Sequence, residues 1–377
     1  MVTAITPDQT KPSSGRLQIG ISALFILVVS RIVLYCISMN ELTNPASQFP
    51  KTPTEANAPL GAGEDVQDQA DQAGYITGVM DPDLPPRLVP FAEFNDANYN
   101  AVQITNDTDA YPIVASCPHA GRDYPAEFTT LATVDIDALR GLEDFGVDQL
   151  LPGFTDHGIT CITSNVARAY LDVNRSADAL DRSMFAGLMP SAVESRHVRA
   201  GYGLIPRLTA ERQSIYNNRL AATTATKRIA AVHTPYHELL AAKMTEVSRR
   251  HGYALLVDFH SMPANDSNNK PLPDIILGDC NGMTLDRRIG LTIAGFFTDF
   301  GLSVGWNNPY SGGFITRNNG KLNSTQQSLQ IEINRRLYMS ADGRKMDVER
   351  TAEMTALLGA FGAYLTRLHE DGLLRSQ

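Results

Sequence analysis

The chain has 377 residues, of which 43% are apolar and 19% are charged, and its net charge is -9. This apolar fraction is enough for a substantial core and excludes a chain that is disordered throughout. The acidic balance argues against nucleic acid as the main partner, although a local arginine cluster can still bind a small anionic substrate. Four cysteines without CxxC spacing indicate buried thiols in a reducing compartment, and they exclude a zinc site made of thiolates.

The N-terminal region contains an apolar stretch at residues 17–37, interrupted by Arg31. A bilayer span needs roughly 20 apolar residues, and a central arginine costs about 2.5–3.5 kcal/mol on insertion. Residues 1–38 are therefore either a membrane anchor or an extension ahead of a true start at Met39. We expect residues 39–80, rich in small and polar residues, to be a flexible linker and residues 81–377 to be the functional domain. The predicted location is cytoplasmic, with anchoring in the inner membrane as the alternative.

Seven segments carry the periodicity of regular structure. Short apolar runs predict strands, and apolar residues at helical spacing predict helices. In chain order they are a strand at 111–117, a strand at 169–173, a helix at 226–250 with a kink at Pro235, a strand at 254–259, a helix at 284–300, a strand at 329–333 and a helix at 347–368. Alternation of helices with short strands predicts an α/β fold.

Polar side chains lie at or near the ends of the predicted strands. His119, Arg175 and His260 follow three strands, and Glu332 lies on a fourth. In open α/β sheets the active site lies outside the carboxyl ends of the strands, so we expect the four side chains to converge. Each also has a plainer interpretation. Either histidine can be structural, Glu332 can lie on the solvated face of an edge strand, and Arg175 can form an ion pair with Asp172.

Eight short motifs give the chain a family resemblance. They are CPHAGRDYP at 117–125, AYLDVNR at 169–175, GLIPR at 203–207, PYHELL at 235–240, LLVDFHSMP at 255–263, DIILGD at 274–279, PYSGGFITR at 309–317 and LQIEINRRLYM at 329–339. In order and spacing, these motifs resemble the N-formylglutamate amidohydrolase family over about residues 85–370.

The resemblance implies a fold and an activity. That family is related to the zinc carboxypeptidases and to the succinylglutamate desuccinylase and aspartoacylase group. It implies a single carboxypeptidase-like α/β domain with a central mixed sheet flanked by helices, and one Zn²⁺ per chain. It also implies hydrolysis of N-formyl-L-glutamate to formate and glutamate, late in histidine breakdown.

The same resemblance assigns roles to residues. His119 and His260 match the two histidine ligands, and Glu332 matches the glutamate that activates water. Asn174 and Arg175 match a pair that contacts the substrate carboxylate or the developing oxyanion. Three further arginines are candidates for the two carboxylates of an acylglutamate: Arg168, Arg317 and Arg335.

The third metal ligand is left open between two aspartates. Zinc carboxypeptidases use a His-x-x-Glu spacing, but Arg122 stands three residues after His119. Asp123 is one residue late, and Asp144 matches an acidic segment of the family. Asp144 is the preferred candidate and Asp123 the alternative.

Two other functions compete with this interpretation. One is a zinc amidohydrolase or peptidase that acts on another acyl amino acid or on a cell-wall peptide, which anchoring through residues 17–37 would favour. The other is a non-catalytic binding protein that keeps the fold. The intact set of His119, His260, Glu332 and Arg175 argues against the second.

Overall fold

The computed structural model describes residues 83–187 and 191–374. The predicted anchor and linker at residues 1–80 lie outside these ranges. Within the described part of the chain, no helix combines the length and the apolar character needed to cross a membrane.

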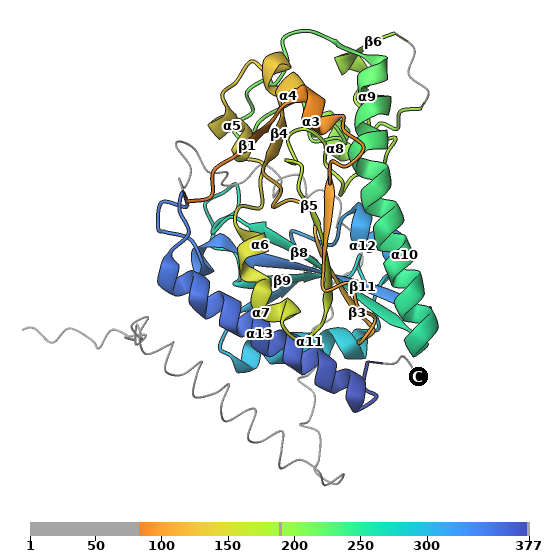
Figure 1. Cartoon of the computed structure of the whole chain (residues 1–377). Coiled ribbons are helices and arrows are strands. Elements are labelled where there is room, and N and C mark those ends of the chain that lie inside the picture. Colours follow the sequence, from red (N-terminus) through yellow and green to blue (C-terminus); the bar gives the residue numbers. More distant parts are fainter. Residues whose placement is uncertain (1–82, 188–190, 375–377) are drawn as a thin grey trace, which may run out of the picture. The chain divides into compact units, whose positions relative to one another are not determined.

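A seven-stranded sheet forms the centre of the fold (Figure 1). Its strands, in spatial order, are β10 (Val304–Trp306), β9 (Ile275–Gly278), β11 (Gln326–Asn334), β8 (Ala254–Met262), β3 (Ile113–Cys117), β5 (Thr160–Ser164) and β2 (Val102–Thr105). The four strands β11, β8, β3 and β5 run parallel, whereas β9 is antiparallel to β11 and β2 is antiparallel to β5. The predicted mixed sheet is therefore confirmed, and the carboxyl ends of β3, β8 and β11 meet at one edge.

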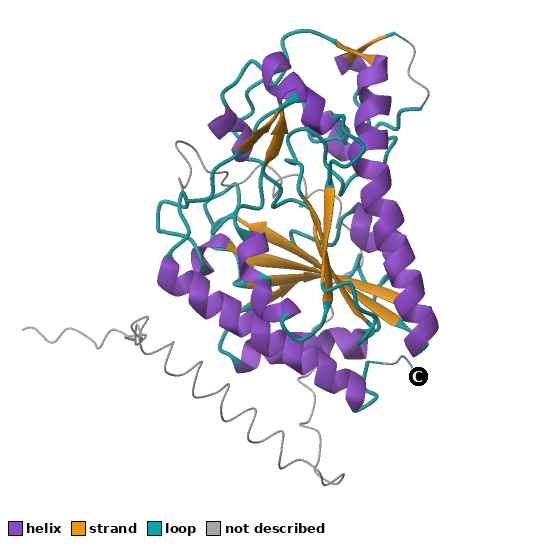
Figure 2. Cartoon of the chain, in the orientation of Figure 1, coloured by secondary structure: helices purple, strands orange, loops and turns teal. Residues whose placement is uncertain are grey.

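Helices cover both faces of this sheet (Figure 2). Helix α10 (Thr234–His251) packs on β3, β5 and β8, and α12 (Phe314–Asn319) packs on β8 and β11. Helix α11 (Arg287–Asp299) packs on β9 and β10. Helix α6 (Val147–Leu150) contacts β8, and α13 (Val348–Glu370) covers α6 and α7 (Pro152–Thr155). This arrangement is the predicted α/β fold.

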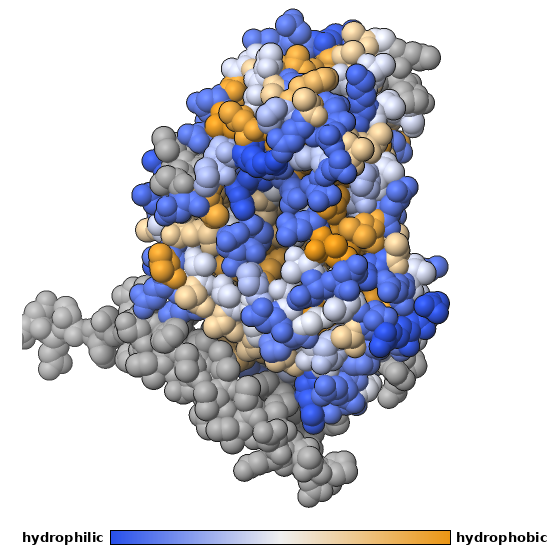
Figure 3. Space-filling view, in the orientation of Figure 1, coloured by the Kyte–Doolittle hydropathy of each residue, from blue (hydrophilic) through white to orange (hydrophobic). Residues whose placement is uncertain are grey.

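Smaller elements lie beyond the carboxyl edge of the sheet (Figure 1). They include two short parallel strand pairs, β1 with β4 and β6 with β7. In chain order, the elements of this group are β1 (Arg87–Val89), α3 (Phe91–Phe94), β4 (Asp123–Pro125), α4 (Ala126–Leu131), α5 (Ile136–Arg140), η1 (Arg182–Met184), β6 (Phe185–Ala186), α8 (Arg196–Ala200), β7 (Leu220–Ala221) and α9 (Ala222–Arg228). The surface seen in Figure 3 is mostly hydrophilic, with apolar side chains in small groups.

The predicted helix at 226–250 is part of a longer helical run. It begins with α9, passes through a π-helical turn η2 (Ile229–His233) and continues as α10. Pro235 lies in the first turn of α10, directly after the wider turn. Because proline lacks a backbone N–H, it interrupts the helical hydrogen bonds here, and the π-helical turn marks an irregularity at the place where we predicted a kink.

The strand predicted at 169–173 is wrong, because these residues form a buried loop. Their apolar side chains, including Tyr170 and Leu171, pack into the core. The loop carbonyls accept hydrogen bonds from helix side chains instead of a neighbouring strand: Arg228 donates to Tyr170 O at 2.9 Å and His237 to Val173 O at 2.8 Å. Every buried carbonyl needs a donor, and here side chains supply it.

Strand β11 is an inner strand, which contradicts the interpretation of Glu332 as a residue on a solvated edge. All its residues from Gln327 to Asn334 are buried. Polar side chains on such a strand must find partners. Asn334 donates to the carbonyls of Leu272 and Pro273, and Gln330 Nε2 donates to Glu332 Oε1 at 2.9 Å.

Candidate metal centre

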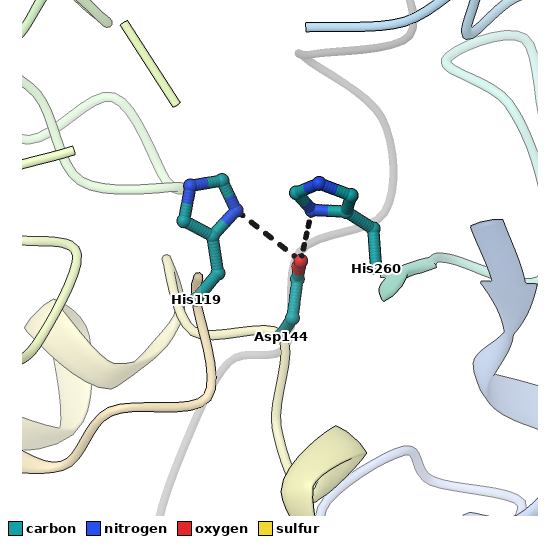
Figure 4. A group of neighbouring side chains, drawn as sticks. All are labelled: His119, Asp144 and His260. Atoms are coloured by element: carbon teal, nitrogen blue, oxygen red, sulfur yellow. Dashed lines mark hydrogen bonds and ion pairs between the residues drawn. The ribbon is translucent and has the colours of Figure 1, made fainter. Parts of the chain in front are cut away.

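Two histidines and one aspartate meet at the carboxyl edge of the sheet (Figure 4). His119 follows the end of β3, His260 lies near the end of β8, and Asp144 lies in the loop between α5 and α6. Asp144 Oδ2 lies 3.3 Å from His119 Nδ1 and 2.9 Å from His260 Nδ1. A backbone hydrogen bond of 3.0 Å from Asp144 N to His119 O ties the loop to the strand end.

The outer nitrogen of the His119 ring is held by a second carboxylate. His119 Nε2 lies 2.7 Å from Asp172 Oδ1. The other oxygen of Asp172 accepts a hydrogen bond from Arg168 Nε at 2.9 Å. A proton held on Nε2 by this carboxylate leaves Nδ1 with a free electron pair that faces Asp144, which is the arrangement of metal-binding histidines.

His260 is held in the same manner. Its Nε2 lies 3.1 Å from Asp258 Oδ2 and 3.3 Å from Asn174 Nδ2. Asp258 is fully buried, and its other oxygen accepts a hydrogen bond from Ser116 at 2.7 Å. Both imidazoles thus present Nδ1 inward and Nε2 outward.

Electrostatics keep the acids of this group ionised. Burial alone would raise the pKa of Asp144, but the hydrogen bonds with His119 and His260 outweigh it and hold the pKa well below its usual value. Burial likewise opposes the ionisation of Asp172, but Arg168 and His119 hold its pKa well below the ordinary range. For His260, burial lowers the pKa, whereas Asp258 and Asp144 together raise it well above the ordinary value. Negative charge thus gathers around the two imidazoles.

The donor set fits a catalytic zinc site. Two imidazole nitrogens and one carboxylate oxygen, all within 4.8 Å of one another and buried, can surround one ion. Zinc binds such atoms at about 2.0–2.2 Å, and catalytic zinc sites use three protein ligands with one position left for water. Asp172 and Asp258 already orient the two rings as outer partners do in such sites.

Glu332 lies beside this group on the neighbouring strand. It is paired in register with His260 across the parallel strands β11 and β8, so both side chains point to the same face of the sheet. Its negative charge contributes to the raised pKa of His260. A buried carboxylate thus lies beside His260 and outside the group of three candidate ligands.

Asn174 and Arg175 lie in the loop that carries Asp172. Asn174 Oδ1 accepts a hydrogen bond from Ile315 N at 2.8 Å, while its Nδ2 faces His260. Arg175 Nε donates to Tyr202 O at 3.0 Å, and its side chain is 10% exposed. The loop therefore places Asn174 beside His260, and Arg175 Nε lies 3.9 Å from Asp172 Oδ2.

The three other candidate arginines occupy different places. Arg168 binds Asp172. Arg335 donates to Glu143 O at 2.6 Å and lies 3.6 Å from Asp144 Oδ1, so it supports the Asp144 loop. Arg317 is exposed on α12 and lines a hollow with Gln326, at the opposite end of β11 from Glu332. A role of Arg317 in binding substrate stays an untested prediction that this placement disfavours.

Asp123, the alternative third ligand, belongs to a different cluster. Its carboxylate forms an ion pair with Arg87 at 2.5 Å and accepts a hydrogen bond from Tyr99 at 2.9 Å. Strand β4, which contains Asp123, pairs with β1, whereas the group of candidate ligands contains Asp144. The geometry therefore corrects the Asp123 assignment in favour of Asp144.

Ser303 stands in a G-x-S-x-G sequence at residues 301–305. Its hydroxyl donates to Asp274 Oδ2 at 2.6 Å, and the chain continues from it into β10. A nucleophilic serine of that motif stands between a strand and a following helix, so Ser303 lacks the required setting.

Sequence reasoning missed the long helical run as part of the site. His233 and His237 donate from it to the loop that carries Asn174 and Arg175. The available signal was the motif PYHELL, which places His237 two residues after a helix-disrupting proline.

Comparison with known proteins points to one family. The sequence pattern that defines N-formylglutamate amidohydrolases matches residues 111–339. The chain is 28% identical over 236 residues to N-formylglutamate deformylase of Pseudomonas putida, covering 60% of this chain and 82% of that protein. A crystal structure of N-formylglutamate amidohydrolase from Ralstonia eutropha is similar with a TM-score of 0.66 and 30% identity, over 71% of this chain and 99% of that one. A gene product of Agrobacterium tumefaciens shares the fold with a TM-score of 0.57 at 18% identity, over 74% of this chain and 98% of that one.

Proposed function

The chain belongs to the N-formylglutamate amidohydrolase family, and from this premise we propose that it is a zinc-dependent hydrolase of N-formyl-L-glutamate. The products are formate and L-glutamate, a reaction that fits the breakdown of histidine. The observation that carries the proposal is the buried group of His119, Asp144 and His260 with Glu332 beside it. Relatives named N-formylglutamate deformylase support the choice of substrate.

His119, Asp144 and His260 would hold the ion. When bound, zinc supplies Lewis acidity that lowers the pKa of a water molecule toward about 7 and polarises the amide oxygen. Asp172 and Asp258 keep the two imidazoles in the tautomer that ligation requires.

Glu332 is the proton carrier of the reaction. It lies on the same face of the sheet as His260, one strand away, and it is buried. From there its carboxylate takes the proton of the attacking water and delivers it to the leaving amine. Gln330 donates to Glu332 Oε1 at 2.9 Å and fixes the direction of the carboxylate.

Arg175 supplies positive charge for the acyl oxygen or for a carboxylate of the substrate. Its fork of N–H groups suits both tasks, and it lies in the same loop as Asp172. Asn174 supports it as a substrate contact, and Arg168, which binds Asp172, is a further candidate cation. An acidic protein with arginines at its centre can thus accept a dianionic substrate.

The test is metal content and formate release on one sample of the full chain. We expect about one zinc per chain, loss of formate release after chelation, and recovery on adding zinc. Bound zinc without formate release would indicate that the substrate is another acyl amino acid or a cell-wall peptide. A protein that neither binds zinc nor hydrolyses any acyl amino acid would refute the proposal in favour of a binding protein.

A further inference from the structure

The loop that positions the metal centre is attached to one long helical run at three points. Arg228 Nη1 donates to Tyr170 O at 2.9 Å, His237 Nε2 to Val173 O at 2.8 Å and His233 Nε2 to Arg175 O at 2.9 Å. Since a carbonyl only accepts, each imidazole carries its proton on Nε2. Three successive donors thus fix the backbone on both sides of Asn174.

The π-helical turn sets up this contact. His233 is the last residue of η2, and the N–H of Thr234 bonds to Ile229 O across the wider turn. His237 lies four residues further, so both imidazoles lie on one face of the helix. Their ring centroids are 4.2 Å apart, and Phe314 packs against both rings. These ring contacts restrict the orientation of both imidazoles.

The loop between these anchors carries the carboxylate that orients His119 and the amide that packs beside His260. Asp172 Oδ1 lies 2.7 Å from His119 Nε2, and Asn174 Nδ2 lies 3.3 Å from His260 Nε2. Arg175 follows immediately. A shift of the backbone at residues 173–175 would displace all three side chains together.

We propose that His233 and His237 are positioning residues, whose Nε2–H groups hold the 173–175 backbone so that Asn174 and Arg175 meet the substrate. This proposal deepens the function proposed above, and its kinetic test rests on that function. Two histidines four residues apart can also bind a metal ion, but here both Nε2 atoms donate to carbonyls and are not available as ligands.

The protonation of the pair agrees with this role. Burial, then the neighbouring His233, lowers the pKa of His237 to about 4. Burial also lowers the pKa of His233. Near neutral pH each ring is uncharged and has one N–H, and that N–H donates the hydrogen bond to the loop carbonyl.

The experiment compares His237→Leu with a matched control on the same helix. His251 Nε2 also donates to a backbone carbonyl, that of Asp109 at 2.8 Å. It lies about 20 Å further along α10. His251→Leu therefore removes an equivalent hydrogen bond far from the metal centre. His237→Gln serves as the conservative variant, since its amide N–H can replace the Nε2–H.

Three quantities are measured on the full chain with zinc bound. They are amide hydrogen exchange over residues 172–178, kcat and KM with N-formyl-L-glutamate, and the melting temperature. In His237→Leu we expect exchange in that segment to become about tenfold faster and kcat to fall about tenfold at nearly constant KM. His251→Leu should lose a similar amount of thermal stability, with kcat and exchange unchanged. His237→Gln should recover most of the wild-type kcat and most of the wild-type protection from exchange.

Unchanged exchange in His237→Leu, or an equal loss of kcat in His251→Leu, would overturn the proposal. A wild-type protein that hydrolyses no acyl amino acid would defeat the proposed function instead. The exchange measurement would still decide whether the histidines hold the loop, because it needs no turnover.

Discussion

Asp144 lies between two imidazoles that come from strands far apart in the sequence. Sequence spacing alone leaves both Asp123 and Asp144 open as the third ligand. Asp123 pairs with Arg87 and Tyr99, whereas Asp144 meets both Nδ1 atoms. Asp144 reaches the histidines because its loop returns across the end of β3. No local sequence pattern predicts this contact.

Replacement of these two aspartates gives a matched pair. Asp144→Asn should weaken zinc binding by more than about 100-fold, because it removes a charged ligand. Asp123→Asn should leave the affinity unchanged and lower the stability by about 1 kcal/mol through its loss of the Arg87 and Tyr99 contacts. Competition with a chelator of known affinity measures the first effect and urea unfolding the second. Equal zinc affinity in the two variants would contradict the assignment.

Glu332 is predicted to act on protons and not on the metal. Glu332→Gln should keep zinc bound while kcat falls by about 100- to 10,000-fold, since an amide cannot accept the proton of water. Zinc analysis and formate release on the same preparation test both parts. Turnover at the wild-type rate would remove Glu332 from the mechanism.

Three inner strands of the sheet, β3, β8 and β11, could be predicted from the sequence, whereas β2, β5, β9 and β10 were not. Buried strands such as β8 and β11 carry their own apolar signature, and so do α11 and α13. The loop at 169–173 carries the same signature, because it is as buried as a strand. Only its hydrogen-bond partners distinguish it, and these are side chains of a helix more than fifty residues later.

Gly313 precedes α12 and lies against Asn174. A Cβ at Gly313 would come within 2.2 Å of the Asn174 side chain, whereas a Cβ at Gly295 in α11 meets nothing within 4 Å. Gly313→Ala should therefore displace Asn174 and lower kcat/KM at least about tenfold. Gly295→Ala should keep activity and add about 0.5–1 kcal/mol of stability. Steady-state kinetics and thermal unfolding of both variants provide the measurement.

The buried histidine pair predicts acid sensitivity of the helical run. The folded pKa of His237 is about 4, below the ordinary 6.5, because burial and then His233 lower it more than the hydrogen bond to Val173 O and the charge of Asp258 raise it. Between these values the unfolded chain binds more protons, so the free energy of unfolding falls as the pH is lowered. His237 accounts for a decrease of about 2 kcal/mol in the free energy of unfolding between pH 7 and pH 5.

Urea unfolding of the metal-free protein at both pH values tests this, with His237→Gln as the comparison. The variant should show the smaller dependence on pH. An identical dependence in the two proteins would mean that His237 titrates normally when folded.

On the scale of the whole molecule, the family pattern and the described fold both lie within residues 81–377. We therefore predict that a chain beginning at residue 81 binds zinc and releases formate with kcat/KM within about twofold of the full chain. Kinetics of the two proteins side by side provide the check. A large loss would assign residues 1–80 a part in activity.

Strand β11 is the last of the sheet to be synthesised, yet it lies between β9 and β8. During translation, at about 5–20 residues per second, β8 and β9 emerge with no partner along the edges that β11 later fills. Open strand edges invite pairing with other chains. The nascent protein thus passes through an interval in which it is prone to aggregation, and that interval ends when residue 334 leaves the ribosome and the sheet closes.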